Sequence, residues 1–147
     1  MKIAIGCDPN AKAAKEELIL FIERKDFGKV TDFGSDDTVY ARVATKVAEA
    51  VARGEYDRGI LICGTGIGMS IAANKVKGAY AALVSDVYSA ERARLSNNAN
   101  IACMGAFTSG PKVREMMTEA FLTKEFVKGC ASQEKVNAYV DYDMKRG

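Results

Sequence analysis

One short stretch, RGILICGTGIGMSIAANK over residues 58–75, constrains the fold more than any other part of the chain. Its apolar run at residues 60–63 is typical of a buried strand, and the glycine-rich turn at residues 64–68 predicts a helix that begins near Met69. Cys63 is therefore expected at the carboxyl end of a strand, facing a helix N-terminus. In open α/β sheets ligands bind at this edge, and the unpaired N–H groups of a helix N-terminus favour an anion.

The rest of the chain repeats this alternation of strands and helices. Short apolar runs predict strands at residues 2–7, 29–33, 79–84 and 101–104, and amphipathic segments predict helices at residues 11–25, 40–53, 88–95 and 112–124. The apolar stripes of the longest helices are Ala14, Leu18, Phe21 and Ile22; Val43, Ala44, Val47 and Val51; and Val113, Met116, Met117, Ala120 and Phe121. Strict alternation predicts a three-layer, Rossmann-like α/β fold, with a five-stranded parallel sheet covered by helices on both faces, in a single domain spanning residues 1–147.

A further helix is predicted after the fifth strand–helix unit. Residues 132–145 carry Val136, Tyr139, Val140 and Met144 at helical spacing. This C-terminal helix is expected to pack either on its own domain or on a second subunit.

The composition excludes several classes of chemistry. The chain contains no histidine, which removes the commonest general base, the commonest metal ligand and every Ser-His or Cys-His pair. Its four cysteines lie far apart, so neither a zinc site nor a disulfide framework is indicated, and we expect no metal and no cofactor. The 21 basic and 19 acidic residues are scattered, which does not indicate nucleic acid or a membrane surface as partner. No apolar run approaches the length of a signal-peptide core or a membrane span, which favours a cytoplasmic protein.

Four candidate site residues each have a functional and a structural interpretation. Cys63 is a candidate catalytic base because the positive end of a helix favours a thiolate, although an isolated strand-end cysteine is more often a small buried hydrophobe. Asp8 ends the first strand and would orient a substrate hydroxyl or hold a proton, whereas the commoner role is a turn or N-cap. Tyr40 is either a cleft hydroxyl or the start of an apolar stripe. Asn97 belongs to a polar cluster with Asn98 and Asn100, whose amides either bind sugar or enediolate oxygens or end a helix.

Four segments carry a resemblance to a known family: CGTGIGMSIAANK at residues 63–75, the first strand ending in Asp8, KVAEAV at residues 46–51, and YSAERARLSNNANI at residues 88–101. Over nearly the whole chain they resemble the family of ribose-5-phosphate isomerase B and galactose-6-phosphate isomerase. The resemblance implies an aldose–ketose isomerase that works through a cis-enediolate without a metal. It also implies a homodimer, or a dimer of dimers, with active sites at the subunit interface and a small sugar phosphate as substrate.

The resemblance assigns a role to each matched residue. Cys63 matches the base that moves the proton between two substrate carbons, and Thr65 matches a hydroxyl that helps to move protons between the two oxygens. The backbone N–H groups that stabilise the enediolate belong to the loop containing Gly64, Gly66, Ile67 and Gly68. Asp8 and Tyr40 match substrate-contacting positions, and Asn97 matches a polar residue that reaches in from the partner subunit.

The chain also departs from the family pattern. Family members usually carry a histidine directly after the first-strand aspartate, where this chain has Pro9, and a ring-opening histidine where it has Ser96. A phosphate-binding arginine after the fifth strand is replaced by Phe107, and an arginine- and histidine-rich segment near residues 129–135 reads GCASQEK. Phosphate would then have to be held by other cations, for which the candidates are Lys124, Lys128, Lys135 and Arg114.

These departures bear on the substrate. Without a ring-opening base an acyclic sugar is favoured, and a tetrose or tetrulose 4-phosphate cannot close a furanose ring through its blocked terminal oxygen. The SAERA-x-LSNNA run and the VNA segment at residues 136–138 are also similar to the erythrulose-4-phosphate isomerase branch, which likewise lacks that histidine. A tetrose phosphate is therefore the preferred substrate. Ribose 5-phosphate, another pentose or hexose phosphate, and an unphosphorylated or carboxylated sugar are the alternatives.

Two functions of other classes, a nucleotide-binding module and an inactive subunit, are the remaining alternatives. The GTG turn before a helix partly resembles a dinucleotide fingerprint, but Met69 stands at its third glycine. The missing histidines and arginine also fit an inactive subunit of a hetero-oligomeric isomerase, although Cys63, Thr65 and the glycine loop are all present.

Overall fold

Five parallel strands form one sheet in the order β2-β1-β3-β5-β4 in the computed structural model, which describes residues 1–147. The strands are β1 (Lys2–Cys7), β2 (Lys29–Asp32), β3 (Arg58–Cys63), β4 (Ala81–Leu83) and β5 (Ile101–Gly105). Every neighbouring pair is parallel, so all carboxyl ends lie at one edge of the sheet. The predicted five-stranded parallel sheet is confirmed, with strand ends within two residues of the expected positions.

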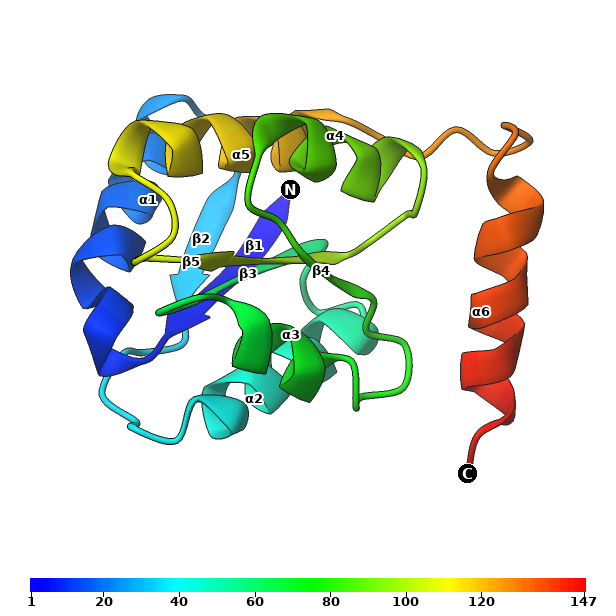
Figure 1. Cartoon of the computed structure of the whole chain (residues 1–147), viewed down its shortest axis with the longest axis horizontal. Coiled ribbons are helices and arrows are strands. Elements are labelled where there is room, and N and C mark those ends of the chain that lie inside the picture. Colours follow the sequence, from blue (N-terminus) through cyan, green and yellow to red (C-terminus); the bar gives the residue numbers. More distant parts are fainter.

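Helices cover both faces of the sheet, as the alternation predicted (Figure 1). The helical segments are η1 (Pro9–Ala11), α1 (Lys12–Arg24), α2 (Tyr40–Ala52), α3 (Ile67–Ala73), α4 (Val87–Leu95), α5 (Pro111–Thr123) and α6 (Gln133–Lys145). The buried side chains of α1, α4 and α5 share one apolar cluster with the sheet, and those of α2 and α3 share the other. The fold is therefore a three-layer, Rossmann-like α/β sandwich. None of its helices combines the length and the apolar character that crossing a membrane requires.

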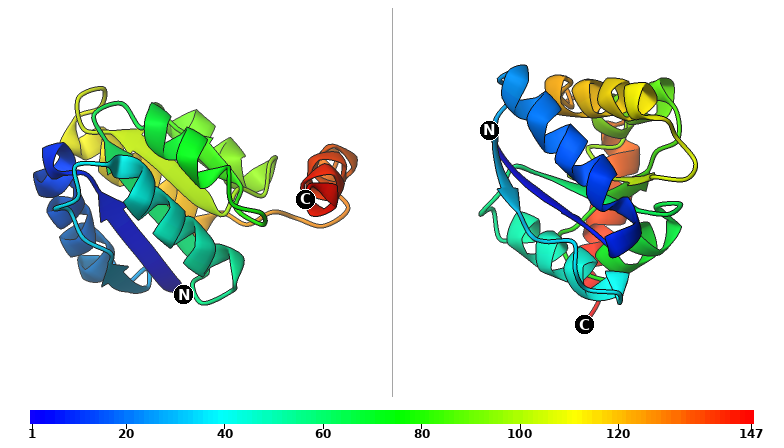
Figure 2. Two further views of the ribbon diagram at one scale, coloured as in Figure 1. Left: turned by 90° about the horizontal axis from the view of Figure 1, so that it is seen from below. Right: turned by 90° about the vertical axis from the view of Figure 1, so that its left-hand side faces the viewer.

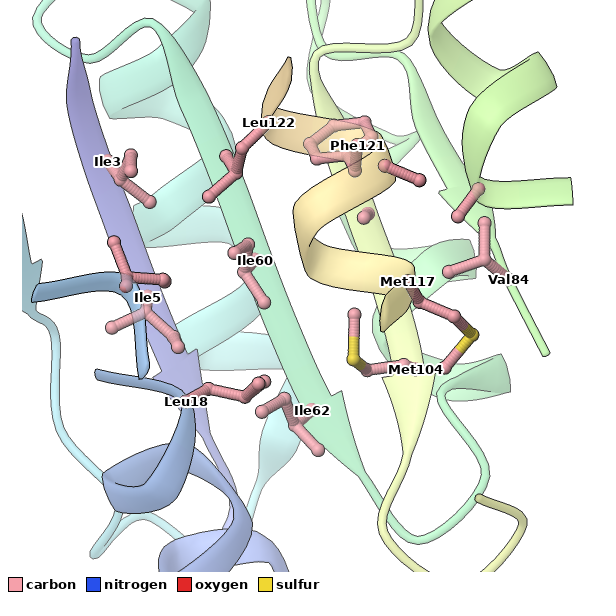
Figure 3. Close-up of a cluster of buried hydrophobic side chains, with 14 of the residues drawn as sticks. Ile3, Ile5, Leu18, Ile60, Ile62, Val84, Met104, Met117, Phe121 and Leu122 are labelled. Carbon is pink, nitrogen blue, oxygen red and sulfur yellow. The ribbon is translucent and has the colours of Figure 1, made fainter. Parts of the chain in front are cut away.

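The two central strands divide their side chains between the two clusters because successive residues of a strand point to opposite faces. Ile60 and Ile62 pack under α1 and α5, whereas Leu61 and Cys63 face α2 and α3. Figure 3 shows the first cluster, where Met117 and Phe121 of α5 lie over the strands. Cys63 thus belongs to the α2–α3 side of the sheet, at the end of a strand whose residues are all buried.

The helix after the glycine loop begins at Ile67, two residues before Met69 and close to the expected start. One expectation about a helix was wrong. The stripe of α5 does not include Val113 and Met116, which are 38% and 46% exposed. The buried side of α5 begins instead at Arg114, whose guanidinium donates to the carbonyl oxygen of Ala106 at 3.4 Å and to that of Ser109, and this turns the helix so that Met117 faces the core.

The C-terminal helix α6 stands apart from the three layers (Figures 1 and 2). Of its predicted stripe, Val136 is buried, Tyr139 and Val140 are half-buried, and Met144 is 52% exposed. A helix that rested on the body through an apolar stripe would bury all four. Its contacts with the rest of the chain are mainly polar, as described below.

Candidate active site

The candidate site lies where the sheet order changes direction. In the sheet, β2 lies on one side of β1. On the other side of β1 lies β3, followed by β5 and β4. The crevice outside the carboxyl ends of β1 and β3 is the place where open α/β sheets bind ligands. Asp8 follows β1 and donates its backbone N–H to the carbonyl oxygen of Ile62 at 3.3 Å, so Asp8 and Cys63 lie at neighbouring strand ends on this edge.

The glycine loop wraps around the sulfur of Cys63. The backbone N–H of Gly66 donates to Sγ of Cys63 at 3.0 Å in a buried position, and a thiolate accepts such a bond better than a thiol. Gly66 has φ 82°, and a Cβ atom there would lie 2.8 Å from Leu83 and 2.9 Å from the backbone of Met104. Only glycine fits this backbone without strain, so the residue type is set by the need to aim its N–H at the sulfur.

The loop also presents N–H groups that have no acceptor in the chain. Ile67 donates to Oγ1 of Thr65 at 3.2 Å, but Gly64, Thr65, Gly68 and Met69 donate no backbone hydrogen bond. Unpaired N–H groups are usual in the first turn of a helix. These N–H groups belong to the same loop as Gly66, which reaches the sulfur of Cys63, and donors of this kind stabilise negative charge on an oxygen. Thr65 is exposed and keeps its own hydroxyl proton available for donation.

Two aromatic rings lie over this loop. Tyr40 begins α2 and covers Gly68, where a Cβ atom would be 2.5 Å from the tyrosine oxygen. Phe107 lies over Gly64 in the same way, 2.9 Å from a Cβ atom built there, and its backbone N–H donates to the Gly64 carbonyl at 2.9 Å. The structure thus places Tyr40 beside the glycine loop, where a cleft hydroxyl was one of its two expected roles. The position of Phe107 over Gly64 was not expected, because the β5–α5 loop shows no motif of its own in the sequence.

Asp8 is buried but one of its carboxylate oxygens, Oδ1, has no hydrogen-bond partner. It stands at the N-cap position of η1, where its backbone carbonyl oxygen accepts a hydrogen bond from Ala11 at 3.1 Å, but its side chain makes no capping hydrogen bond. A buried carboxylate oxygen without a partner costs about 1–3 kcal/mol unless a donor reaches it.

The other thiols differ from Cys63 in their surroundings. Burial raises the pKa of Cys7 to about 12 and also raises that of Cys103, which in addition feels the neighbouring Cys63. Neither accepts a hydrogen bond from a backbone N–H. Cys7 and Cys103 therefore behave as buried apolar side chains, Cys130 is half-buried in the segment before α6, and Cys63 is the thiol whose sulfur accepts a backbone hydrogen bond.

The cations proposed for phosphate binding are not gathered at this site. Arg114 is buried, and it uses its donors on the carbonyl oxygens of Ala106 and Ser109 and lies 3.8 Å from Glu17. Lys124, Lys128 and Lys135 are exposed and form no ion pair. No group of three potential metal ligands occurs in the structure either.

Asn97 lies at the opposite edge of the sheet from Cys63. It precedes β5, whose first residue Ile101 is level with Gly59 near the start of β3, whereas Cys63 is level with Gly105 at the other end. Ser96 ends α4 and accepts a hydrogen bond from Nε of Arg92 at 2.7 Å. Within one chain, Asn97 is thus not brought together with the other predicted site residues.

Comparison with known proteins gives a consistent result. Residues 3–139 match the family model described as Ribose/Galactose Isomerase. The chain is 47% identical to the Ribose-5-P isomerase B of Listeria innocua, covering 99% of both proteins. It is 45% identical to a D-erythrulose-4-phosphate isomerase of Mycolicibacterium smegmatis, covering 97% of both. Among solved structures, the type B ribose 5-phosphate isomerase of Trypanosoma cruzi superposes with a TM-score of 0.91 at 38% identity, over 99% of this chain and 100% of that one.

Proposed function

The chain belongs to the ribose/galactose isomerase family and is a sugar-phosphate aldose–ketose isomerase, and we propose that it uses Cys63 as its base on an acyclic tetrose or tetrulose 4-phosphate. The observation that carries this proposal is the buried hydrogen bond from Gly66 to the sulfur of Cys63, at the sheet edge that binds ligands. The chain has no histidine, and no other side chain at this edge suits the role of a base that removes a proton from carbon as well as Cys63 does.

In the proposed reaction, the thiolate of Cys63 removes the proton from the carbon next to the substrate carbonyl. The electron pair moves to the carbonyl oxygen, which gives a cis-enediolate. The unpaired N–H groups of Gly64, Thr65, Gly68 and Met69 stabilise the developing charge. The hydroxyl of Thr65 passes a proton between the two substrate oxygens, and Cys63 returns its proton to the neighbouring carbon, so the step is a net isomerisation.

Asp8 and Tyr40 are proposed to bind substrate hydroxyls. The free Oδ1 of Asp8 accepts one hydroxyl and thereby gains the partner that it lacks. The phenol of Tyr40, held over Gly68, borders the loop on the other side. Because Asn97 lies at the far edge of its own sheet, we propose a homodimer in which Asn97 of the partner subunit completes the site.

The proposed substrate follows from what the site lacks. Opening a furanose ring needs an acid–base group, and neither Pro9 nor Ser96 supplies one. A sugar that is already open avoids this step. Phe107 places an apolar ring, which is 73% exposed, beside Gly64. This wall would lie beside the carbon chain of the substrate and supplies no charge to its phosphate.

Ribose 5-phosphate is the second candidate, because the relative at 47% identity is named for it. The third candidate is an inactive subunit that assembles with a related chain. Deuterium incorporation from D₂O into the carbon next to the carbonyl separates these candidates. We expect fast exchange with erythrose and erythrulose 4-phosphates, slow exchange with ribose 5-phosphate and allose 6-phosphate, and none in Cys63→Ala. Faster exchange with ribose 5-phosphate would overturn the tetrose preference, and no exchange with any sugar would favour the inactive subunit.

A further inference from the structure

The turn that carries Asn97 is held in place on several sides. Asn98 has φ 51°, an uncommon conformation outside glycine, and its Oδ1 accepts a hydrogen bond from Arg94 at 3.1 Å. Arg94 also donates to the carbonyl oxygen of Ala99 at 2.6 Å, and its guanidinium is buried. Asn100 accepts from the backbone N–H of Tyr80 at 2.8 Å. The backbone between residues 97 and 100 therefore has little freedom.

Asn97 differs from its two neighbours in the use of its side chain. The amides of Asn98 and Asn100 both make hydrogen bonds inside the chain. The amide of Asn97 makes none and is exposed. A side chain that binds a ligand in another subunit needs a free amide and a fixed backbone. Asn97 has both.

The last contact to this turn comes from α6. The phenol of Tyr139 donates to the backbone carbonyl oxygen of Asn97, across 42 residues of sequence. The ring of Tyr139 lies 5.8 Å from that of Tyr80, at 48°. Asp143, one helical turn after Tyr139 on the same face of α6, accepts from the phenol of Tyr80 at 3.0 Å and from the backbone N–H of Gly78 at 2.8 Å.

These contacts, and not apolar packing, set the distance between α6 and the turn. A cavity of about 390 Å³ separates them, lined by Tyr80, Asn97, Tyr139, Tyr142, Asp143 and Arg146 among others. Burial raises the pKa of Tyr80 to about 12 and raises that of Tyr139 as well, so both phenols keep the proton that they donate at neutral pH. Tyr139 thus adds a contact at Asn97 itself to a turn that Arg94 and Asn100 hold at its other residues.

We propose that Tyr139 is a positioning residue for the isomerase reaction, which fixes Asn97 so that its amide reaches the substrate in the partner subunit. This inference rests on the proposed role of Asn97. Tyr139 itself does not touch substrate. Tyr80 contacts the ring of Tyr139, and Asp143 binds α6 to the body of the chain, so both help to place the hydroxyl of Tyr139.

Tyr139→Phe tests this, because it removes the hydroxyl and keeps the ring. Tyr142→Phe is the matched control, since Tyr142 lies on the same helix, is 76% exposed and makes no hydrogen bond. We expect Tyr139→Phe to lower kcat about tenfold with KM changed less than about twofold, as for a misplaced catalytic group. Tyr142→Phe should match the wild type. Equal kcat values in Tyr139→Phe and the wild type would overturn the proposal.

A double-mutant cycle with Asn97→Ala separates positioning from a merely structural role. If Tyr139 acts through Asn97, the phenylalanine substitution has no further effect on kcat in Asn97→Ala. Additive losses would contradict the proposal. If Asn97→Ala is as active as the wild type while Cys63→Ala is inactive, the role of Asn97 fails and the positioning role with it. An inactive wild-type protein would instead refute the proposed function.

Discussion

The two ends of the sheet are built in different ways. At the carboxyl edge, Cys63 receives its hydrogen bond from Gly66, three residues along the chain, and the surrounding donors are backbone N–H groups. At the amino edge, the turn that carries Asn97 is held by local contacts of Arg94 and also by Tyr139, 42 residues away, on a helix that is bound through contacts spanning 63 and 65 residues. The loop around Cys63 is a local backbone structure, whereas the turn of Asn97 also uses long-range side-chain contacts.

This contrast predicts which substitutions affect chemistry and which affect assembly of the site. At the carboxyl edge, a change of one atom or one backbone angle should lower the activity sharply. At the amino edge, single substitutions should lower the activity less, because several side chains hold the turn together. The following predictions test this difference.

Cys63→Ala should have the largest effect. Removing the carbon base lowers kcat/KM by roughly 10²–10⁴-fold, with little change in the thermal unfolding midpoint. Cys103→Ala is the control, because it removes a buried thiol from the same apolar cluster on the next strand. Steady-state kinetics and calorimetry of both variants check this. Activity of Cys63→Ala near that of the wild type would contradict the proposed mechanism.

Alkylation by iodoacetamide should distinguish the thiols. Cys7 and Cys103 are fully buried with raised pKa values, so both should react very slowly at neutral pH. Cys63 is expected to react at least about tenfold faster, because its sulfur lies at the ligand-binding edge of the sheet, and erythrulose 4-phosphate should protect it. Mass spectrometry of each peptide over time, beside residual activity, gives the rates. Activity loss that follows Cys7 or Cys103 instead would contradict the assignment.

Gly66→Ala should affect both stability and activity. The alanine requires a positive φ and a contact of 2.8 Å with Leu83, which together cost about 1–3 kcal/mol and turn the N–H away from the sulfur. Gly54→Ala is a matched control, because Gly54 has φ 78° but nothing within 4 Å of the new methyl. Urea unfolding and kinetics should show a stability loss in both and an activity loss in Gly66→Ala alone. Equal activity losses would show that strain, not the aimed N–H, is the cause.

The smallest effect is expected at Asp143. Burial acts to raise the pKa of this carboxyl, but hydrogen bonds from Gly78, Tyr80 and Arg146 outweigh it and lower the pKa below 3.8. A lowered folded-state pKa means that the ionised group stabilises the fold above the unfolded value, and that this is lost as pH falls through the folded value. The unfolding free energy of the wild type minus that of Asp143→Asn should therefore shrink as pH drops below 4. A difference that grows at low pH would reverse this sign.

The same contrast explains what the sequence could predict. The strand, the glycine loop and Cys63 were all correctly expected, because their geometry is set within six residues of contiguous chain. The buried stripes of α1 and α2 were also correct, since helical periodicity is a local property. The exposed face of α5 was misjudged because Arg114, a charged residue, occupies a buried position through contacts with a neighbouring loop.

The contacts of α6 could not be predicted from local patterns. Tyr139 and Asp143 appear in the sequence as part of an ordinary amphipathic helix, and nothing nearby indicates that they bind to residues 78–97. Phe107 was noted only as a missing arginine. Its position over Gly64 depends on the pairing of β3 with β5, which brings the two loops together.

The central claim is that Cys63 of one subunit and Asn97 of the other form one active site. Coexpression of Cys63→Ala and Asn97→Ala chains with different tags, and purification of the mixed dimer through both, tests it directly. In a mixed dimer one site has both residues and the other has neither, so we expect about half of the wild-type activity per dimer from two weakly active parents. A mixed dimer no more active than the mean of its parents would contradict the claim.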